Sequence, residues 1–166
     1  MKNDEFVFEK VVYLTDTNAE GNVYFARFFE WQGMAREEFL RQNVPNHMEI
    51  LGSGVRLITA NAWMTYQSEC RLFDVVKIKI NTASLKPASL ELVFTFLKKG
   101  TDEPIGRGGE RLTFASKEGH LIQIPKSIRE NAERFLVSPA PEVVELGLRN
   151  RNKILQGSES HGEPES

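Results

Sequence analysis

Hydrophobic and polar residues alternate along several segments of the chain, and a period of two is typical of strands with one buried face. In residues 76–80, Val76, Ile78 and Ile80 alternate with two lysines. Other segments of this kind are residues 6–14, a long or bent strand over 55–72, residues 90–96, and a stretch that includes Leu112 and Phe114. Residues 99–102 are predicted to form a turn, and three glycines open the final strand. The predicted order is a strand, a helix, and then four or more antiparallel strands.

The helix between the first two strands is predicted over residues 25–41. At about 100° per residue, one mostly apolar stripe carries Phe25, Phe29, Gly33, Arg36 and Leu40. In this stripe Arg36 is costly unless it is paired or takes part in function. Gly33, one turn earlier, costs about 1 kcal/mol relative to alanine and lets a backbone or a ligand come close. A functional Arg36 and an Arg36 that only reaches solvent or a structural carboxylate both fit this pattern.

Length, charge and cysteine content exclude several classes of protein. The chain has 166 residues, of which 40% are hydrophobic, as expected for one domain. Its formal net charge of −2 argues against nonspecific binding to nucleic acid or to an anionic membrane. Cys70 is the only cysteine, which excludes an internal disulfide and any multi-cysteine metal site, so we expect neither metal nor cofactor. With no signal-peptide or membrane-spanning run in the sequence, we expect a cytoplasmic protein.

Composition divides the chain into a domain and an extension. Residues 1–137 are dense in aromatic and branched residues, whereas residues 138–166 are rich in polar residues, proline and glycine. Within the extension, PEVVELGLRNRNKIL has the pattern of a short amphipathic helix that Gly147 weakens. We expect residues 156–166 to be disordered.

The segment DTNAEGNVYF, residues 16–25, precedes the predicted helix. Its residue types favour a loop in which Asn18 or Asn22 caps and Gly21 adopts a positive φ. The segment also resembles the signature of hotdog-fold thioesterases of the 4-hydroxybenzoyl-CoA thioesterase type, through Asp16, Asn18, Gly21, Tyr24 and, one residue late, Phe28. The resemblance continues through FFEWQGMAREEFL and ends with IPKSIRENAERFL. It implies an α+β hotdog fold, in which an antiparallel sheet of about five strands wraps around one central helix, and a homodimer or tetramer.

One departure from that signature narrows the resemblance. The second acid of the motif, the catalytic carboxylate in one branch of the family, is Asn18 here, and an amide cannot be a nucleophile or a general base. DTNxxGNVY followed by WQG and Arg36 resembles the enediyne polyketide branch, in which the Asn and the helix Arg replace the carboxylate. This resemblance implies hydrolysis of a β-ketoacyl or polyene thioester from an acyl carrier protein, with decarboxylation of the freed β-keto acid as a sequel.

Thioester hydrolysis places negative charge on the carbonyl oxygen, so hydrogen-bond donors near it are the main catalytic need. The backbone N–H groups of Gly21, Asn22 and Val23 are the predicted donors. Asn18 would polarise the carbonyl or hold water, and Arg36 would stabilise the oxyanion or the freed carboxylate. Glu69 is the candidate base, or else a solvated or Arg36-paired carboxylate. The predicted substrate-binding residues are Asp16, Tyr24, Phe29, Gly33, Thr59 and Tyr66. Structural roles also fit some of them: Asp16 fits a loop cap, Tyr24 and Phe29 fit the hydrophobic core, and Thr59 fits an ordinary strand position.

Acyl carrier protein and coenzyme A both present phosphate, so we expect a basic entrance. The candidate cations are Lys77, Lys79, Lys86, Lys98, Lys99, Arg107 and Arg111, which could equally form a solvated face. Two other functions remain open from the sequence. One is a general acyl-CoA thioesterase with Asp16 or Glu69 as base, and the other is a hotdog module that binds an acyl chain or a carrier without catalysis.

Overall fold

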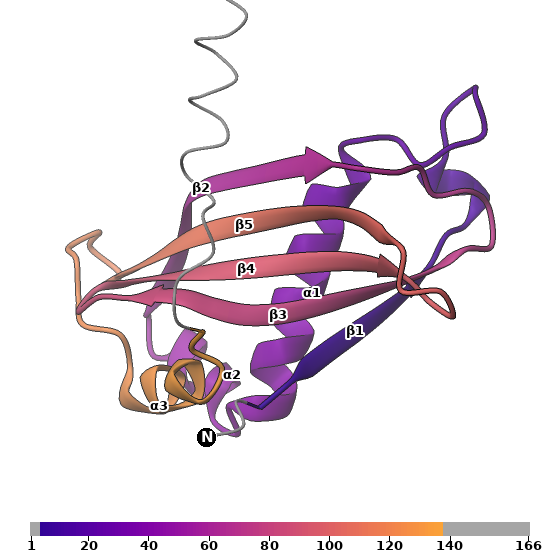
Figure 1. Ribbon diagram of the computed structural model, residues 1–166. Coiled ribbons are helices and arrows are strands. Elements are labelled where there is room, and N and C mark those ends of the chain that lie inside the picture. The colour runs from indigo at the N-terminus through magenta and orange to yellow at the C-terminus, as the bar shows by residue number, and fades with distance from the viewer. Residues whose placement is uncertain (1–3, 138–166) are drawn as a thin grey trace, which may run out of the picture.

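A five-stranded antiparallel sheet curves around one long helix (Figure 1). The computed structural model describes residues 4–137. Its elements are β1 (Phe6–Val11), the 3-10 turn η1 (Leu14–Asp16), α1 (Arg27–Asn43), α2 (His47–Gly52), β2 (Arg56–Tyr66), β3 (Val75–Leu85), β4 (Ser89–Lys98), β5 (Pro104–Ala115) and α3 (Lys126–Arg134). The strand order is β1-β3-β4-β5-β2, so β1 and β2 are the edges. The expected α+β hotdog arrangement is confirmed.

The alternating segments of the sequence form the strands, with some changes at their ends. Val76, Ile78 and Ile80 are fully buried on β3, and their lysine neighbours are partly exposed, as predicted. The long second strand ends at Tyr66, because residues 67–72 leave the sheet, and it carries an irregularity between Thr59 and Asn61. The first strand ends before Leu14, which lies in η1 and is 74% exposed.

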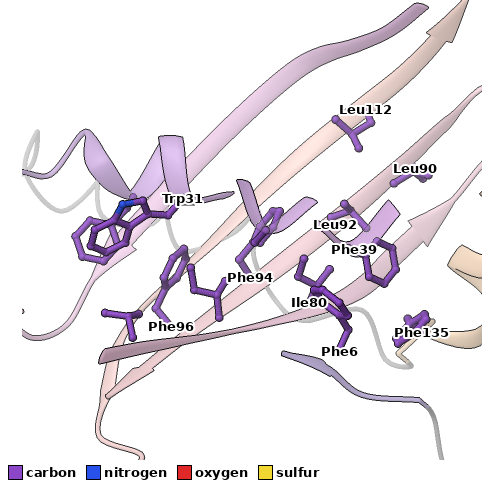
Figure 2. Close-up of a cluster of buried hydrophobic side chains, with 14 of the residues drawn as sticks. Phe6, Trp31, Phe39, Ile80, Leu90, Leu92, Phe94, Phe96, Leu112 and Phe135 are labelled. Atoms are coloured by element: carbon purple, nitrogen blue, oxygen red, sulfur yellow. The ribbon is translucent and has the colours of Figure 1, made fainter. Parts of the chain in front are cut away.

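The buried face of α1 is rotated relative to the predicted stripe. Its buried residues are Phe28, Trp31, Gln32, Ala35 and Phe39, and Figure 2 shows Trp31 and Phe39 over the apolar side chains of the sheet. In contrast, Phe25 is 55% exposed and Phe29 is 36% exposed. The predicted stripe is therefore the margin of the core. Large apolar residues of α1 such as Phe29 and Met34 are not covered by the sheet of the same chain. Because these exposed residues are also apolar, the hydrophobic pattern predicted a face that is rotated from the buried one.

Glycines in β5 make room for side chains that pack against the strand. A Cβ on Gly109 would lie 2.3 Å from the indole nitrogen of Trp63, and a Cβ on Gly108 would lie 2.4 Å from Nε2 of Gln32. Gln32 is fully buried, and its Nε2 donates to the carbonyl of Trp63 at 3.2 Å. The glycine-rich opening of this strand is thus a packing requirement for α1 and β2.

Two short helices that the sequence pattern did not predict cover one end of α1. α2 follows α1 after three residues, and α3 lies beside α2 (Figure 1). The segment after α3 is tied to β3, because Thr82 N–H donates to the carbonyl of Phe135 at 2.9 Å. The predicted helix and disordered tail beyond residue 137 lie outside the described residues.

Candidate functional site

The loop before α1 is organised around Asp16, which is 7% exposed. Its Oδ2 accepts hydrogen bonds from Lys10 Nζ and from the backbone N–H of Tyr13, both at 2.8 Å. Burial acts to raise the pKa of Asp16, but the Lys10 ammonium and the Tyr13 N–H outweigh it and leave the pKa lowered. Asp16 therefore organises the loop. Lys10, four residues into the first strand, has no signal in the sequence that links it to this site.

Asn18 holds the tip of the same loop with one side of its amide. Its Oδ1 accepts the backbone N–H of Glu20 at 2.9 Å, and Gly21 has the expected positive φ, 81°. Among residues 4–137, the Asn18 Nδ2 group donates to no other group. With Oδ1 engaged, Asn18 presents a hydrogen-bond donor at this site.

Two of the three predicted oxyanion donors need correction, whereas the N–H of Asn22 has no acceptor within residues 4–137 and stays a prediction. The N–H of Gly21 donates to the carbonyl of Asn18 at 3.0 Å, and that of Val23 donates to the carbonyl of Cys70 at 2.9 Å, so neither is free. α1 begins at Arg27, later than the loop spacing suggested. Within the described residues, the N–H groups of Phe25 and Ala26 have no acceptor. These two unbonded donors lie at the positive end of α1, where an anionic oxygen is favoured.

Glu69 lies against this loop and away from Arg36. Its Oε1 accepts a hydrogen bond from Asn22 Nδ2 at 3.1 Å, and its other oxygen is 3.7 Å from Arg71. The side chain is 61% exposed. The alternative that Glu69 pairs with Arg36 is therefore wrong, and Glu69 is a solvated carboxylate next to the Asn18 loop.

The partner of Arg36 is Glu110, which no sequence motif singles out. Arg36 Nη1 donates to Glu110 Oε2 at 2.6 Å and to Thr59 Oγ1 at 3.2 Å. The two charged side chains are 17% and 5% exposed. Burial raises the pKa of Glu110, and the charge and hydrogen bond of Arg36 offset only part of that increase. The available signal was that Glu110 has the same strand parity as Leu112 and Phe114, both of which are buried.

Within one chain the predicted residues form two separate clusters. Arg36 is nine residues beyond Arg27, which places it about 13 Å along the axis from the start of α1. Arg36 and Asn18 of the same chain therefore do not meet at one carbonyl oxygen. Between them lie Phe29 and Gly33, and a Cβ on Gly33 would meet nothing within 4 Å.

Of the two predicted tyrosines near the start of α1, Tyr66 is hydrogen-bonded to the backbone there, whereas Tyr24 is exposed. Tyr66 Oη donates to the carbonyl of Phe25 at 2.8 Å, and its ring contacts Phe28 edge to face. Burial raises the pKa of the Tyr66 hydroxyl. Tyr24 is 46% exposed and stacks obliquely on Phe25, so it is not part of the core.

A surface groove and an inner cavity meet at Arg36. The groove has a volume of about 540 Å³, and Met34, Met48 and Leu51 are among its walls. The inner cavity, of about 10 Å³, lies between α1, the sheet and α3. Arg36, Leu40 and Leu57 line both spaces. The cavity alone has room for about one water molecule.

Other candidate chemistries find little support in residues 4–137. Burial raises the pKa of the Cys70 thiol to about 12, so it is a poor nucleophile. No group of three or more potential metal ligands occurs there, and no helix there is long and apolar enough to span a bilayer. Of the predicted basic entrance, five cations (Lys77, Lys79, Lys98, Lys99 and Arg111) form ion pairs with carboxylates, which reduces the positive potential of that surface.

Comparison with known proteins places the chain in a family. The model of the thioesterase-like superfamily matches residues 12–144. The acyl-CoA thioester hydrolase YbgC of Escherichia coli O157:H7 is 31% identical over 84 residues, which are 51% of this chain and 61% of that protein. The dynemicin thioesterase structure is 27% identical, covers 81% of this chain and 99% of its own, and has a TM-score of 0.75. A gentisyl-coenzyme A thioesterase is 25% identical, with coverage of 76% and 99% and a TM-score of 0.68. The chain therefore belongs to the thioesterase-like superfamily and is a thioester hydrolase of the hotdog fold.

Proposed function

We propose that this thioester hydrolase releases a β-ketoacyl or polyene polyketide chain from an acyl carrier protein, and that the freed β-keto acid then loses CO₂. The observation that carries the proposal is Asn18, which replaces an acid in the family signature and, in the loop before α1, has an amide Nδ2 with no acceptor among residues 4–137. The likeness to the dynemicin thioesterase, a structure determined with polyene binding, supports the choice of substrate.

Thioester hydrolysis at this site depends more on hydrogen-bond donors to the oxyanion than on a general base. The proposed donors to the thioester carbonyl are the N–H groups of Phe25 and Ala26 and the Nδ2 of Asn18, which have no acceptor among the described residues. Attack by water forms a C–O bond and moves the carbonyl electron pair onto oxygen. Each well-placed donor to that oxyanion lowers the barrier by about 3 kcal/mol. Collapse of the intermediate breaks the C–S bond, and the thiolate leaves and takes up a proton.

The carboxylate of Glu69, which is hydrogen-bonded to the loop, is the proposed acceptor of the proton of the attacking water. Glu69 is held there by Asn22, whose neighbour in the loop tip is Gly21. Because Glu69 is largely exposed, it is a weak base, and an activated β-keto thioester suits such a site better than a plain acyl thioester. Loss of CO₂ from the freed acid needs no base, because the electron pair of the broken C–C bond moves to the β-carbonyl.

The acyl chain follows the partly exposed margin of α1. Phe29 supplies an apolar wall, and the open space over Gly33 leaves a path toward Arg36. About 13 Å from the start of the helix, Arg36 is the cation that can bind an oxygen farther along an extended chain. Glu110 and Thr59 fix its guanidinium, so the group is positioned before the substrate arrives.

We also infer that the protein is a homo-oligomer in which a second copy covers the β2 edge. β2 is an 11-residue edge strand with mostly exposed side chains, and such an edge is prone to pair with another strand. Sedimentation of the wild type and of Ile58→Lys on β2 tests this, with Val7→Lys on β1 as the matched control, because these residues are 38% and 39% exposed. Dissociation by Ile58→Lys alone is expected, whereas a monomeric wild type would contradict the inference.

A second candidate function is a general acyl-CoA thioesterase. It is favoured by the identity to YbgC, named as an acyl-CoA thioester hydrolase, although the match spans 61% of that protein. Asn18 disfavours it, because a plain acyl thioester needs a stronger base than this site offers.

Mass spectrometry of the released products separates these functions. β-Ketoacyl groups and saturated acyl groups are offered on acyl carrier protein and, separately, on coenzyme A. Release of the β-ketoacyl group from the carrier protein alone, followed by the methyl ketone, is expected. Equal turnover of saturated acyl-CoA would replace the proposal with the general thioesterase. Tight acyl binding without turnover would indicate a binding module.

Two variants with matched controls test the residues. Asn18→Ala is expected to lower kcat/KM at least a hundredfold, a typical effect of removing one oxyanion donor. The double variant Arg36→Met/Glu110→Leu, which leaves no unpaired buried charge, is expected to lower kcat/KM because the cation for the distal oxygen is lost. Asn46→Ala, an exposed asparagine without a capping bond, and Arg134→Ala, an exposed arginine of α3 that pairs with Asp4, should retain activity. Full activity of both site variants would overturn the assignment.

A further inference from the structure

Asn131 is a buried amide whose hydrogen bonds are not accounted for by the fold. It lies in the middle of α3 and is 3% exposed. Within the described residues, neither its Oδ1 nor its Nδ2 has a hydrogen-bond partner. Its helical neighbours Ile128 and Ala132 belong to the hydrophobic core. A buried amide without partners is unfavourable, and an apolar side chain would satisfy the packing of α3 better.

The amide lines the inner cavity described above. The other walls of this cavity are apolar apart from Arg36. Figure 2 shows four of them, Phe39 on α1 and Leu90, Leu92 and Leu112 on the sheet. The Nε of Arg36 is also buried without a partner, so the cavity has an unsatisfied polar group on each of two elements.

The cavity continues the path that the proposed function gives to the acyl chain. The surface groove and the cavity share Arg36, Leu40 and Leu57, so the shared residues form a neck. A chain that passes this neck meets apolar walls and then the Asn131 amide. Because the free volume is only about 10 Å³ without a ligand, a chain end must displace Leu40 or Leu57 to enter.

We infer that the cavity under α3 binds the distal end of the acyl chain and that Asn131 selects chains that end in a hydroxyl group. This inference rests on the proposed thioesterase function and goes beyond it by naming the far end of the substrate. A hydroxyl group both donates and accepts a hydrogen bond, so it can satisfy the Oδ1 and the Nδ2 of Asn131 together. A hydrocarbon end leaves both atoms unpaired.

The test compares matched chains with and without the hydroxyl group. β-Ketoacyl groups from hexanoyl to dodecanoyl length on acyl carrier protein, each beside its ω-hydroxy counterpart, are assayed for kcat/KM. Binding of decanoic and ω-hydroxydecanoic acid is measured by calorimetry as a readout independent of turnover. The proteins are the wild type, Asn131→Leu, and Glu130→Gln as the control, because Glu130 is an exposed neighbour on α3.

The wild type and Glu130→Gln should prefer the ω-hydroxy chain about tenfold at the lengths that reach the cavity, as expected for one to two hydrogen bonds. Asn131→Leu should abolish or reverse that preference. Equal values for the paired chains in the wild type, or a preference that survives in Asn131→Leu, would overturn the inference and leave Asn131 to a buried water. The wild-type comparison needs no variant, so it decides the matter even if the substitution prevents folding.

The two readouts separate this inference from the proposed function. If no thioester is hydrolysed but the ω-hydroxy acid binds more tightly through Asn131, the inference stands and the function fails. If thioesters are hydrolysed without any preference at the far end, the function stands and the inference fails.

Discussion

Removal of either partner of the Arg36–Glu110 pair is expected to destabilise the protein much more than removal of both. The two side chains contact each other at 2.6 Å, with 17% and 5% of their surfaces exposed. Burying a charge alone is costly, whereas a buried pair and an apolar replacement of similar volume are close in free energy. Glu110→Leu, Arg36→Met and the double substitution therefore form an informative cycle.

The magnitudes follow from what each single substitution leaves behind. Glu110→Leu leaves Arg36 with Thr59 and some access to water, so we expect a loss of about 3 kcal/mol, the low end for breaking a buried pair. Arg36→Met leaves a 5% exposed carboxylate with no other hydrogen bond in residues 4–137, and we expect about 4 kcal/mol. The double variant should lie within about 1 kcal/mol of the wild type, because no unpaired charge remains.

The loss in Arg36→Met should also depend on pH. Burial raises the pKa of Glu110 above its ordinary value of 4.5, and removal of Arg36 raises it further. The folded state then binds more protons than the unfolded state above pH 4.5, so the free energy of unfolding falls as the pH rises through this window. The deficit of Arg36→Met should therefore be smallest at acid pH and should grow toward neutral pH.

Urea unfolding, followed by tryptophan fluorescence from Trp31 and Trp63, measures these free energies at one fixed protein concentration. The cycle should give a coupling free energy of about 6 kcal/mol, because each single variant leaves an unpaired buried charge and the double variant leaves none. Additive single substitutions, with coupling below about 0.5 kcal/mol, would show that the pair is solvated in solution and would refute the reasoning.

Three further predictions concern other parts of the fold. Asp16→Asn should lower the free energy of unfolding by about 1 kcal/mol at neutral pH, because the hydrogen bond from Lys10 is weakened. The pKa of Asp16 is lowered in the folded state, so its stabilising contribution is lost when the wild type is protonated below pH 3.8. Chemical denaturation should therefore show the difference between variant and wild type shrinking as the pH falls below 3.8. Gly33→Ala should raise the free energy of unfolding by up to about 1 kcal/mol, because a Cβ at this position would meet no atom within 4 Å. The same substitution should weaken substrate binding. A destabilised variant would show that the space is occupied. Cys70 should react with a thiol reagent only when the protein unfolds, because the side chain is 1% exposed and burial raises its pKa to about 12. Rapid labelling of the native protein would contradict this burial.

The sequence determined the sheet and the central helix, because these elements have a period that the chain itself displays. A strand such as β3, in which buried and partly exposed residues alternate from Val76 to Ile80, can be predicted from the alternation of apolar and polar residues in the sequence. The loop signature likewise predicted the positive φ of Gly21 and the place of Asn18 before the helix. Local residue types fix these features, so no distant contact is needed to infer them.

Only the tertiary structure decided which groups face one another. Glu110 is 74 residues from Arg36, and no local pattern links a strand residue to a helix residue at that separation. The same holds for the Trp63 indole over Gly109 and for the place of Asn131 in the cavity. It also holds for the oxyanion donors, because the N–H of Val23 donates to the carbonyl of Cys70, a residue distant in the sequence, whereas the N–H groups of Phe25 and Ala26 meet no acceptor within residues 4–137. Hydrogen-bond partners depend on the position of the whole chain, and the period of a segment specifies only which of its faces is apolar.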